Sequence, residues 1–411
     1  MKLLKQQAPL AFAFMATALV LVGVFQSWSL SLTILNYCLI ASIMSLGLNI
    51  QWGYAGLFNV GLMGFAALGG MSAVLVTMKP VPEAWAVGGA GIGMGIVTTV
   101  ATILLAIAAY RRLPKGYVRG WGMATVIVLG YFAARYFFDP ATNLIESVNP
   151  AQTGFLGGLG LPVWVAWAVG GVLAAGVAWV IGKITLGLRS DYLAIATLGI
   201  SEIIIAVLKN EEWLTRGVKN VNGIPRPMPY EYDLQQQVWA QEWAVWFGAD
   251  VQDFTSIYVK VCSAGLALSV LLVLYWLSQT AIKSPWGRMM RAIRDNETAA
   301  EAMGKHVTGR HLQVFILGSA VVGIAGAMMT TFDGQFTPTT YNPLRFTFLI
   351  WVMVIVGGSG NNLGAIVGGF VIWFFWVEAE PMGYALLNFL TSGMDADSAL
   401  RAHLLDSAAH M

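Results

Sequence analysis

Side chains that support catalysis or metal binding are sparse in this sequence and are not grouped. Cys38 and Cys262 lie in apolar stretches, where we expect free buried thiols rather than a disulfide. The phosphate-binding pattern Gly-x-x-x-x-Gly-Lys-Ser/Thr is absent, and the nearest candidate, Gly182-Lys183-Ile184-Thr185, has neither the spacing nor a hydroxyl residue directly after the lysine. We therefore expect no catalytic residue, no cofactor and no ATP hydrolysis by this chain. No metal-ligand spacing connects the four histidines: His306, His311, His403 and His410.

The composition is that of a membrane protein. Of the 411 residues, 57% are hydrophobic and only 11% are charged, and apolar runs of about 20 residues recur along the chain. The net charge of +2 excludes a nucleic-acid partner on electrostatic grounds. An intramembrane enzyme is disfavoured because no cluster of His, Asp or Glu falls within the apolar runs. We expect a multi-pass protein surrounded by membrane lipid.

Residues 281–310 form the most charged segment and lie between two apolar runs. Ser284 before Pro285 predicts the start of one short helix, and Asp295 is the expected cap of a second. Gly304 suits the left-handed position that ends a helix. The second helix would then carry a flat stripe of small side chains, on which a partner surface can pack closely: Asn296, Ala299, Ala300 and Met303. The alternative is a basic loop that only fixes the topology.

This segment resembles the EAA loop of ABC-importer permeases through Glu297-Thr298-Ala299-Ala300-Glu301-Ala302-Met303-Gly304. More of the chain resembles one branch, the LivM-type permease of branched-chain amino acid importers. Five stretches match, and the 284–304 loop is one of them. They are spread over roughly residues 35–377 and occur in the order found in that family. The others are Leu48-Asn49 through Gly53-Tyr54-Ala55-Gly56-Leu57-Phe58, Arg189-Ser190-Asp191-Tyr192-Leu193-Ala194-Ile195-Ala196-Thr197-Leu198-Gly199, Asn222-Gly223-Ile224-Pro225-Arg226-Pro227 and Val356-Gly357-Gly358-Ser359-Gly360.

The resemblance implies an all-α polytopic transmembrane bundle of the ABC-importer permease type. In that family the loop inserts short helices into a groove on an ATPase subunit. The implied partners are a homologous second permease subunit, two ABC ATPase subunits and a periplasmic amino-acid-binding protein that delivers leucine, isoleucine, valine or a related amino acid. The implied ATPase-coupling residues are Arg291, Arg294, Glu297, Ala299, Ala300, Glu301 and Gly304.

Hydropathy predicts about ten or eleven spans, near residues 8–27, 30–50, 56–77, 85–110, 120–138, 160–182, 192–208, 256–280, 311–332, 344–357 and 361–377. If the N-terminus is cytoplasmic, the inner loops hold 14 of the 23 basic residues and four acids. This asymmetry follows the positive-inside tendency. We therefore expect a protein of the bacterial inner membrane with a cytoplasmic N-terminus.

We expect a transmembrane permease domain over residues 1–377, with a periplasmic loop at 209–255 and the cytoplasmic coupling loop at 281–310. Trp239, Trp243 and Trp246 predict an interfacial helix in the periplasmic loop. Residues 378–411 are expected to form a separate periplasmic segment. Because LivM-type chains usually continue into a last span and a cytoplasmic tail, we expect this sequence to be truncated.

Five polar residues are candidates for a substrate pathway. Glu202 is the only carboxylate well inside a predicted span, ~16 Å from the cytoplasmic end of its helix. An acid at this depth needs a partner, either the ammonium group of a substrate or a neighbouring helix. Amides and a phenol flank the glycine-rich third span, where they either line a path or bridge packed helices: Asn49, Gln51, Tyr54 and Asn59.

Two alternatives remain at the level of function. Urea, amide and nucleoside importers have permeases similar to this one, so the cargo is open. For an ion-coupled secondary carrier we would expect paired carboxylates or basic residues within the spans, whereas Glu202 is the only acidic residue within the predicted spans.

Overall fold

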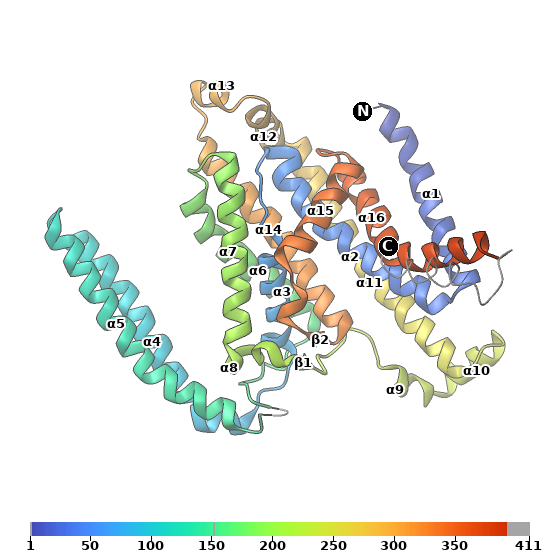
Figure 1. Ribbon diagram of the computed structural model, residues 1–411, viewed down its shortest axis with the longest axis horizontal. Coiled ribbons are helices and arrows are strands. Elements are labelled where there is room, and N and C mark those ends of the chain that lie inside the picture. The colour runs from blue at the N-terminus through green and yellow to red at the C-terminus, as the bar shows by residue number, and fades with distance from the viewer. Residues whose placement is uncertain (1, 151–152, 393–411) are drawn as a thin grey trace.

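The computed structural model describes residues 2–150 and 153–392, and these residues are almost entirely helical. A helix is present at each of the eleven predicted spans (Figure 1). These helices are α1 (Lys2–Phe25), α2 (Trp28–Leu48), α3 (Leu62–Thr77), α4 (Pro82–Arg112), α5 (Tyr117–Ser147), α6 (Val163–Thr185), α7 (Ser190–Asn210), α11 (Val251–Lys283), α14 (Val307–Asp333), α15 (Pro343–Gly357) and α16 (Asn362–Leu390).

Within the described residues, eight helices are long and apolar enough to cross a membrane. Three further apolar helices are shorter: Pro9–Phe25, Leu62–Thr77 and Pro343–Gly357. The last of these has 15 residues, or about 22 Å of helix, which is less than the ~30 Å apolar thickness of a bilayer. The all-α polytopic fold is confirmed.

Small residues set the close packing at the centre of the bundle, where α3, α6 and α14 contact one another and α2 packs on α14 and α16. A Cβ atom on Gly69 of α3 would lie 1.9 Å from the carbonyl oxygen of Gly323 in α14. One on Gly326 would lie 2.0 Å from the carbonyl oxygen of Ala66. Glycine at these positions lets the backbones approach, as expected for helix association in lipid.

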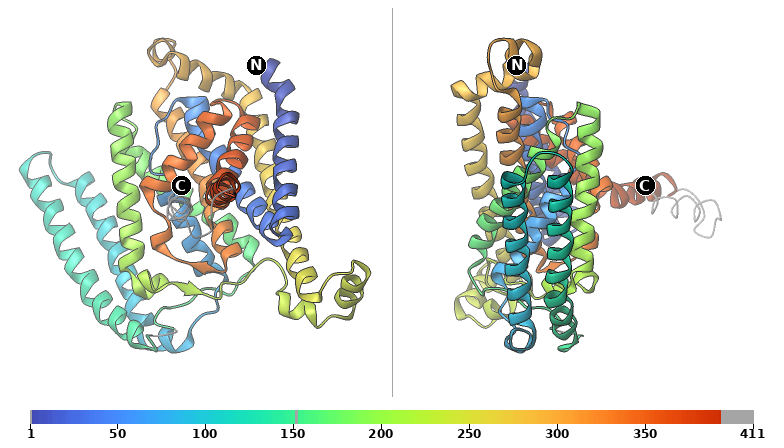
Figure 2. Two further views of the ribbon diagram at one scale, coloured as in Figure 1. Left: turned by 45° about the vertical axis from the view of Figure 1, so that its right-hand side comes forward. Right: turned by 90° about the vertical axis from the view of Figure 1, so that its left-hand side faces the viewer.

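The hairpin formed by α4 and α5 stands apart from this bundle (Figure 2). It is anchored at one end only, by a small apolar cluster that contains Ala84, Ile92 and Ile145. The ring of Phe138 also packs edge-on against Trp213, with the ring centroids 5.5 Å apart. Most of the hairpin's apolar surface is therefore exposed beyond this anchor.

The predicted loop at 209–255 is partly structured. It contains α8 (Glu212–Thr215), the 3-10 turn η2 (Gly217–Lys219), α9 (Glu231–Gln235) and α10 (Val238–Trp246). A two-residue strand, β1 (Val221–Asn222), pairs antiparallel with β2 (Gln335–Phe336), and the 3-10 turn η3 (Pro338–Thr340) follows β2. A helix does form over the tryptophans, and Trp243 and Trp246 are exposed on α10.

Three predicted boundaries are wrong. The helix expected from residue 56 begins at Leu62, because Gly56 takes a positive φ of 72° and the Asn59 side chain accepts a hydrogen bond from the backbone of Gly61. The gap at 51–55 between the predicted spans 30–50 and 56–77 is mostly a π-helical turn, η1 (Asn49–Gly53), which continues α2. The predicted segment boundary at 378 lies inside α16, which runs through Pro381 to Leu390.

Figure 2 shows that the last part of α16 turns away from the bundle. A proline inside a helix removes one backbone hydrogen bond and causes such bends. Glu378, just before the bend, is buried and accepts a hydrogen bond from Gln26 at 2.8 Å. The rest of the predicted 378–411 segment, from residue 393, lies outside the described residues. Cys38 is a buried free thiol as predicted, whereas the free thiol of Cys262 is only half-buried.

Candidate functional site

Two short helices protrude together at one end of the bundle, opposite β1 and β2 (Figure 1). They are α12 (Pro285–Asp295) and α13 (Glu297–Ala302), and they connect α11 to α14. As predicted, Ser284 caps α12, since its hydroxyl accepts a hydrogen bond from the Gly287 amide at 3.4 Å. The predicted cap of α13 is wrong by one residue: the side chain of Asn296, and not Asp295, accepts from the Ala299 amide at 3.0 Å. Together, α12 and α13 are named the docking helices below.

The docking helices have distinct inner and outer faces. The inner face of α12 buries Gly287, Met290 and Ile293 in the main apolar core. The outer face of α13 exposes Ala299 and Met303, together with the carboxylates of Glu297 and Glu301. Ala300 was expected in the exposed stripe but is 9% exposed and packs inward. It therefore supports α13 from behind instead of offering contact surface.

Gly304 ends this element as predicted. Its φ is 76°, a left-handed conformation that costs non-glycine residues about 1–2 kcal/mol. Its amide donates to the Glu301 carbonyl at 2.8 Å, and the Lys305 amide donates to the Ala300 carbonyl at 3.1 Å. These bonds satisfy carbonyls at the end of α13 and fix the direction in which the chain enters α14.

Arg294 connects the docking helices to the bundle. Its guanidinium Nη1 donates to the carbonyl oxygen of Gly53 at 2.6 Å, and Gly53 is the last residue of the π-helical turn η1. Its Nη2 also contacts the carboxylate of Asp295 at 3.2 Å. The other predicted arginine, Arg291, makes only long contacts to carbonyls of its own loop, those of Gly287 and Ile282, at 3.5 Å each.

Directly behind Gly53 lies a buried group of polar side chains, named the amide cluster: Asn49, Gln51, Tyr54, Asn59 and Asn362. Asn49 donates to the Asn362 side chain at 2.9 Å and accepts from the Gly360 amide at 2.8 Å. Burial raises the pKa of Tyr54 to about 12, so its hydroxyl stays protonated and donates to the Asn362 oxygen at 3.1 Å.

The remainder of the amide cluster reaches α14. Gln51 donates to the Phe315 carbonyl at 2.9 Å and to the Ser319 hydroxyl at 3.1 Å. Its own oxygen accepts from Asn59 at 2.8 Å. The two bonds from Gln51 to α14 join segments that are distant in sequence, and the side chains of Gln51 and Asn59 are fully buried.

The four cluster residues predicted from sequence are buried in this structure and form hydrogen bonds within the chain. The hypothesis of bridged helices expects these bonds, and the place of the four residues on a substrate pathway stays a prediction. Asn362 was not among the pathway candidates predicted from the sequence. An asparagine pair behind glycines at the start of an apolar helix was the available signal, because Asn361 caps α16 and leaves Asn362 facing inward.

Glu202 has a different environment. It lies on the exposed side of α7, and its carboxylate makes no hydrogen bond or ion pair with any described part of the chain. The hypothesis of a hydrogen bond to a neighbouring helix of this chain is thus not supported. The same exposed side carries Ile195, Gly199 and Ala206 at helical spacing.

The sequence matches the profile of the family described as "Branched-chain amino acid transport system / permease component" over residues 30–383. The high-affinity branched-chain amino acid transport system permease protein LivM of Salmonella typhimurium is 26% identical over 254 residues, covering 61% of this chain and 56% of that protein. The probable LivM of Methanocaldococcus jannaschii is 24% identical over 336 residues, covering 79% and 74%. The xylose transport system permease protein XylH of Escherichia coli is 24% identical over 294 residues, covering 67% and 61%.

The chain spans a little over half the length of the Salmonella relative that it matches. No solved structure matches it significantly. The family match, however, covers most of the chain, including the docking helices, the amide cluster and α7. This multi-pass membrane protein therefore belongs to the family of permease components of branched-chain amino acid transport systems.

Proposed function

We propose that this chain is a permease subunit of an ATP-driven importer for branched-chain amino acids. It would work with a homologous second permease, two ABC ATPase subunits and a periplasmic amino-acid-binding protein. The observation that carries this proposal is the pair of capped docking helices at one end of a bundle that matches the family. The chain itself would supply the membrane path and the coupling, and it would make or break no bond.

The exposed side of α13 is the proposed contact with an ATPase subunit. Ala299 and Gly304 carry no large side chain, so a partner backbone can approach closely there, while Glu297 and Glu301 offer carboxylates to basic groups. Arg294 then provides the inward connection, because a displacement of α12 pulls on the Gly53 carbonyl and through it on the amide cluster. ATP-driven closure of the ATPases would thereby tilt α2, α14 and α16 together.

The charge distribution supports an orientation with the N-terminus and the docking helices in the cytoplasm of a bacterial inner membrane. In this orientation the 209–255 region with α8, α9 and α10 lies outside. We place the contact with the binding protein there, since the outer end of the bundle also carries β1 and β2 (Figure 1).

We place the translocation path along the exposed side of α7, between this chain and the second permease. A carboxylate exposed halfway along an apolar helix is costly in lipid, so Glu202 is best explained by water, a partner subunit or a cationic group beside it. The ammonium group of an amino acid in transit is such a group.

Uptake of labelled leucine tests the cargo. Deleting the gene should abolish binding-protein-dependent leucine uptake, and the wild-type chain should restore it. Glu202→Gln should restore it only in part, while Glu83→Gln, which removes an exposed acid from the start of α4, should restore it fully. Leucine uptake that survives the deletion would contradict the branched-chain assignment, and xylose uptake lost in its place would identify a sugar importer.

A further inference from the structure

The free end of the α4–α5 hairpin is a basic and aromatic surface that the proposed transport function does not use. The turn between the two helices spans residues 113–116, and the tip as defined here also includes the adjoining helix ends. It carries four cations: Arg111, Arg112, Lys115 and Arg119. The acids of the hairpin, Glu83, Asp139 and Glu146, lie near its anchored end. The tip is therefore strongly positive, with no acidic side chain from residue 84 to residue 138.

The cations at the tip divide into two kinds. Arg119 serves the turn itself: its Nε and Nη2 donate to the Leu113 carbonyl at 3.2 and 2.9 Å, and its guanidinium lies 4.9 Å from the centre of the Tyr110 ring. Arg111, Arg112 and Lys115 are exposed and make no hydrogen bond or ion pair within residues 2–150 and 153–392. Three cations are thus available to an external anion.

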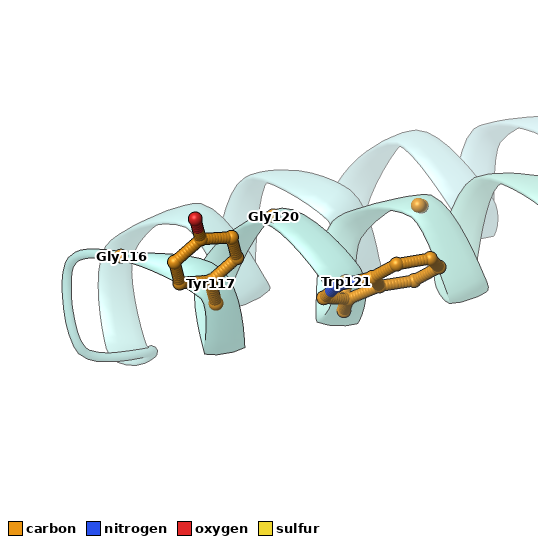
Figure 3. A pocket seen from close by; sticks show the side chains of 5 residues that line it. Gly116, Tyr117, Gly120 and Trp121 are labelled. Carbon is orange, nitrogen blue, oxygen red and sulfur yellow. The ribbon is translucent and has the colours of Figure 1, made fainter.

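A hollow of about 530 Å³ adjoins these cations on α5. It is lined by Gly116, Tyr117, Gly120, Trp121 and Ala124, and Figure 3 shows the rings of Tyr117 and Trp121 one after the other along the helix. Tyr117 is 88% exposed and Trp121 is 73% exposed. The lining is apolar while the turn beside it is basic, so the combined surface fits an amphiphile with an anionic head.

The hairpin places this surface at the level of lipid headgroups. Each helix has 31 residues, or about 46 Å, whereas the apolar core of a bilayer is ~30 Å thick. None of the most apolar stretch of α5 is buried inside the protein. The flanks of the hairpin therefore contact lipid chains, and its tip extends into the headgroup region.

We propose that the tip of the α4–α5 hairpin binds an anionic phospholipid. Arg111, Arg112 and Lys115 contact the phosphate-bearing headgroup, and an acyl chain lies in the hollow between Tyr117 and Trp121. The tip points toward the same end of the molecule as the docking helices (Figures 1 and 2). In the proposed orientation this end faces the cytoplasmic leaflet, where a juxtamembrane basic cluster attracts anionic lipids. The site itself is independent of the transport proposal.

Native mass spectrometry of the purified chain tests this site. The chain is released from nanodiscs that contain equal amounts of phosphatidylglycerol and phosphatidylcholine, and the retained lipids are counted. We expect retention of phosphatidylglycerol in preference to phosphatidylcholine. Arg112→Gln combined with Lys115→Gln should lower that retention at least about tenfold, since each cation near anionic headgroups contributes substantially to binding. Lys79→Gln combined with Lys209→Gln removes equal charge near the opposite end of the molecule and should leave retention unchanged.

A second variant tests the hollow separately. A Cβ atom at Gly120 would meet no atom within 4 Å, so a larger side chain can start there, and Gly120→Leu should occupy the hollow and also reduce retention. Inorganic phosphate added alone should not displace the lipid, because it cannot occupy the hollow. Equal retention of both lipids, unchanged retention in both tip variants, or complete displacement by phosphate would each overturn the proposal. A second protein chain retained at the tip in place of lipid would do so as well.

Discussion

Arg294 contacts both the docking helices and the interior of the bundle through one guanidinium group. Its bond to the Gly53 carbonyl is short, at 2.6 Å, and joins residues 241 positions apart in sequence. Hydrogen bonds to charged groups stabilise proteins by about 1.5–3 kcal/mol. A positive-inside loop that only set the topology would not require such a bond, so this contact favours a mechanical role for the segment.

Replacing Arg294 by glutamine tests that role. We expect Arg294→Gln to lower the free energy of unfolding of the purified chain by about 2 kcal/mol, measured by thermal unfolding in detergent, and to reduce leucine uptake severalfold. Arg288→Gln removes the same charge from an exposed position of α12 and is the control. Equal stability and equal uptake in the two variants would show that Arg294 transmits nothing to the bundle.

Among the elements, the π-helical turn η1 carries hydrogen bonds that connect three long helices. It holds Asn49 and Gln51, and through them α2 is joined to α14 and to the start of α16. The amide cluster fixes the relative positions of these helices more specifically than apolar packing alone, since an unsatisfied buried amide is costly. We therefore expect these helices to move as one body.

Asn49→Ala should lower the free energy of unfolding by about 1–3 kcal/mol, because it leaves the Gly360 amide without its acceptor and removes one of the two donors to the Asn362 oxygen. Asn210→Ala is a matched control, since Asn210 is an exposed amide bonded within its own helix. Thermal unfolding of the two purified variants measures the difference. If Asn49→Ala were as stable as the control but lost uptake, the pathway hypothesis for this residue would replace the bridging one.

Local patterns in the sequence predicted the helices well. Long apolar runs, the Ser284-Pro285 pair and Gly304 each determine where a helix lies or ends through residues close in sequence. They did not predict which side each polar residue faces. Asn49 and Glu202 both lie in apolar helices, yet one is buried in a hydrogen-bonded cluster and the other is exposed. That difference depends on which helices pack together, and packing is determined by contacts distant in sequence. The continuation of α16 past 378 was missed for the same reason, since Glu378 is accommodated by Gln26 from the other end of the chain.

At the scale of the whole molecule, the segments with proposed functions follow one another along the axis of the bundle. The docking helices lie at one end, the amide cluster lies directly behind them, and β1 with β2 lies at the far end (Figure 1). The α4–α5 hairpin is attached beside this axis and does not contribute to the central packing. This arrangement fits a bundle that is moved from one end while the hairpin stays in contact with lipid.

The coupled rates of ATP hydrolysis and leucine uptake test the central claim, that the docking helices transmit the work of separate ATPases. Both rates would be measured in proteoliposomes that contain the assembled importer. The variant is Gly304→Pro in this chain, and the control is Gly309→Ala, at a nearby glycine without a positive φ. Gly304→Pro should assemble with the ATPases and insert normally, but lose uptake and the stimulation of ATP hydrolysis by the loaded binding protein. Uptake and stimulation equal to those of the wild type would contradict the account.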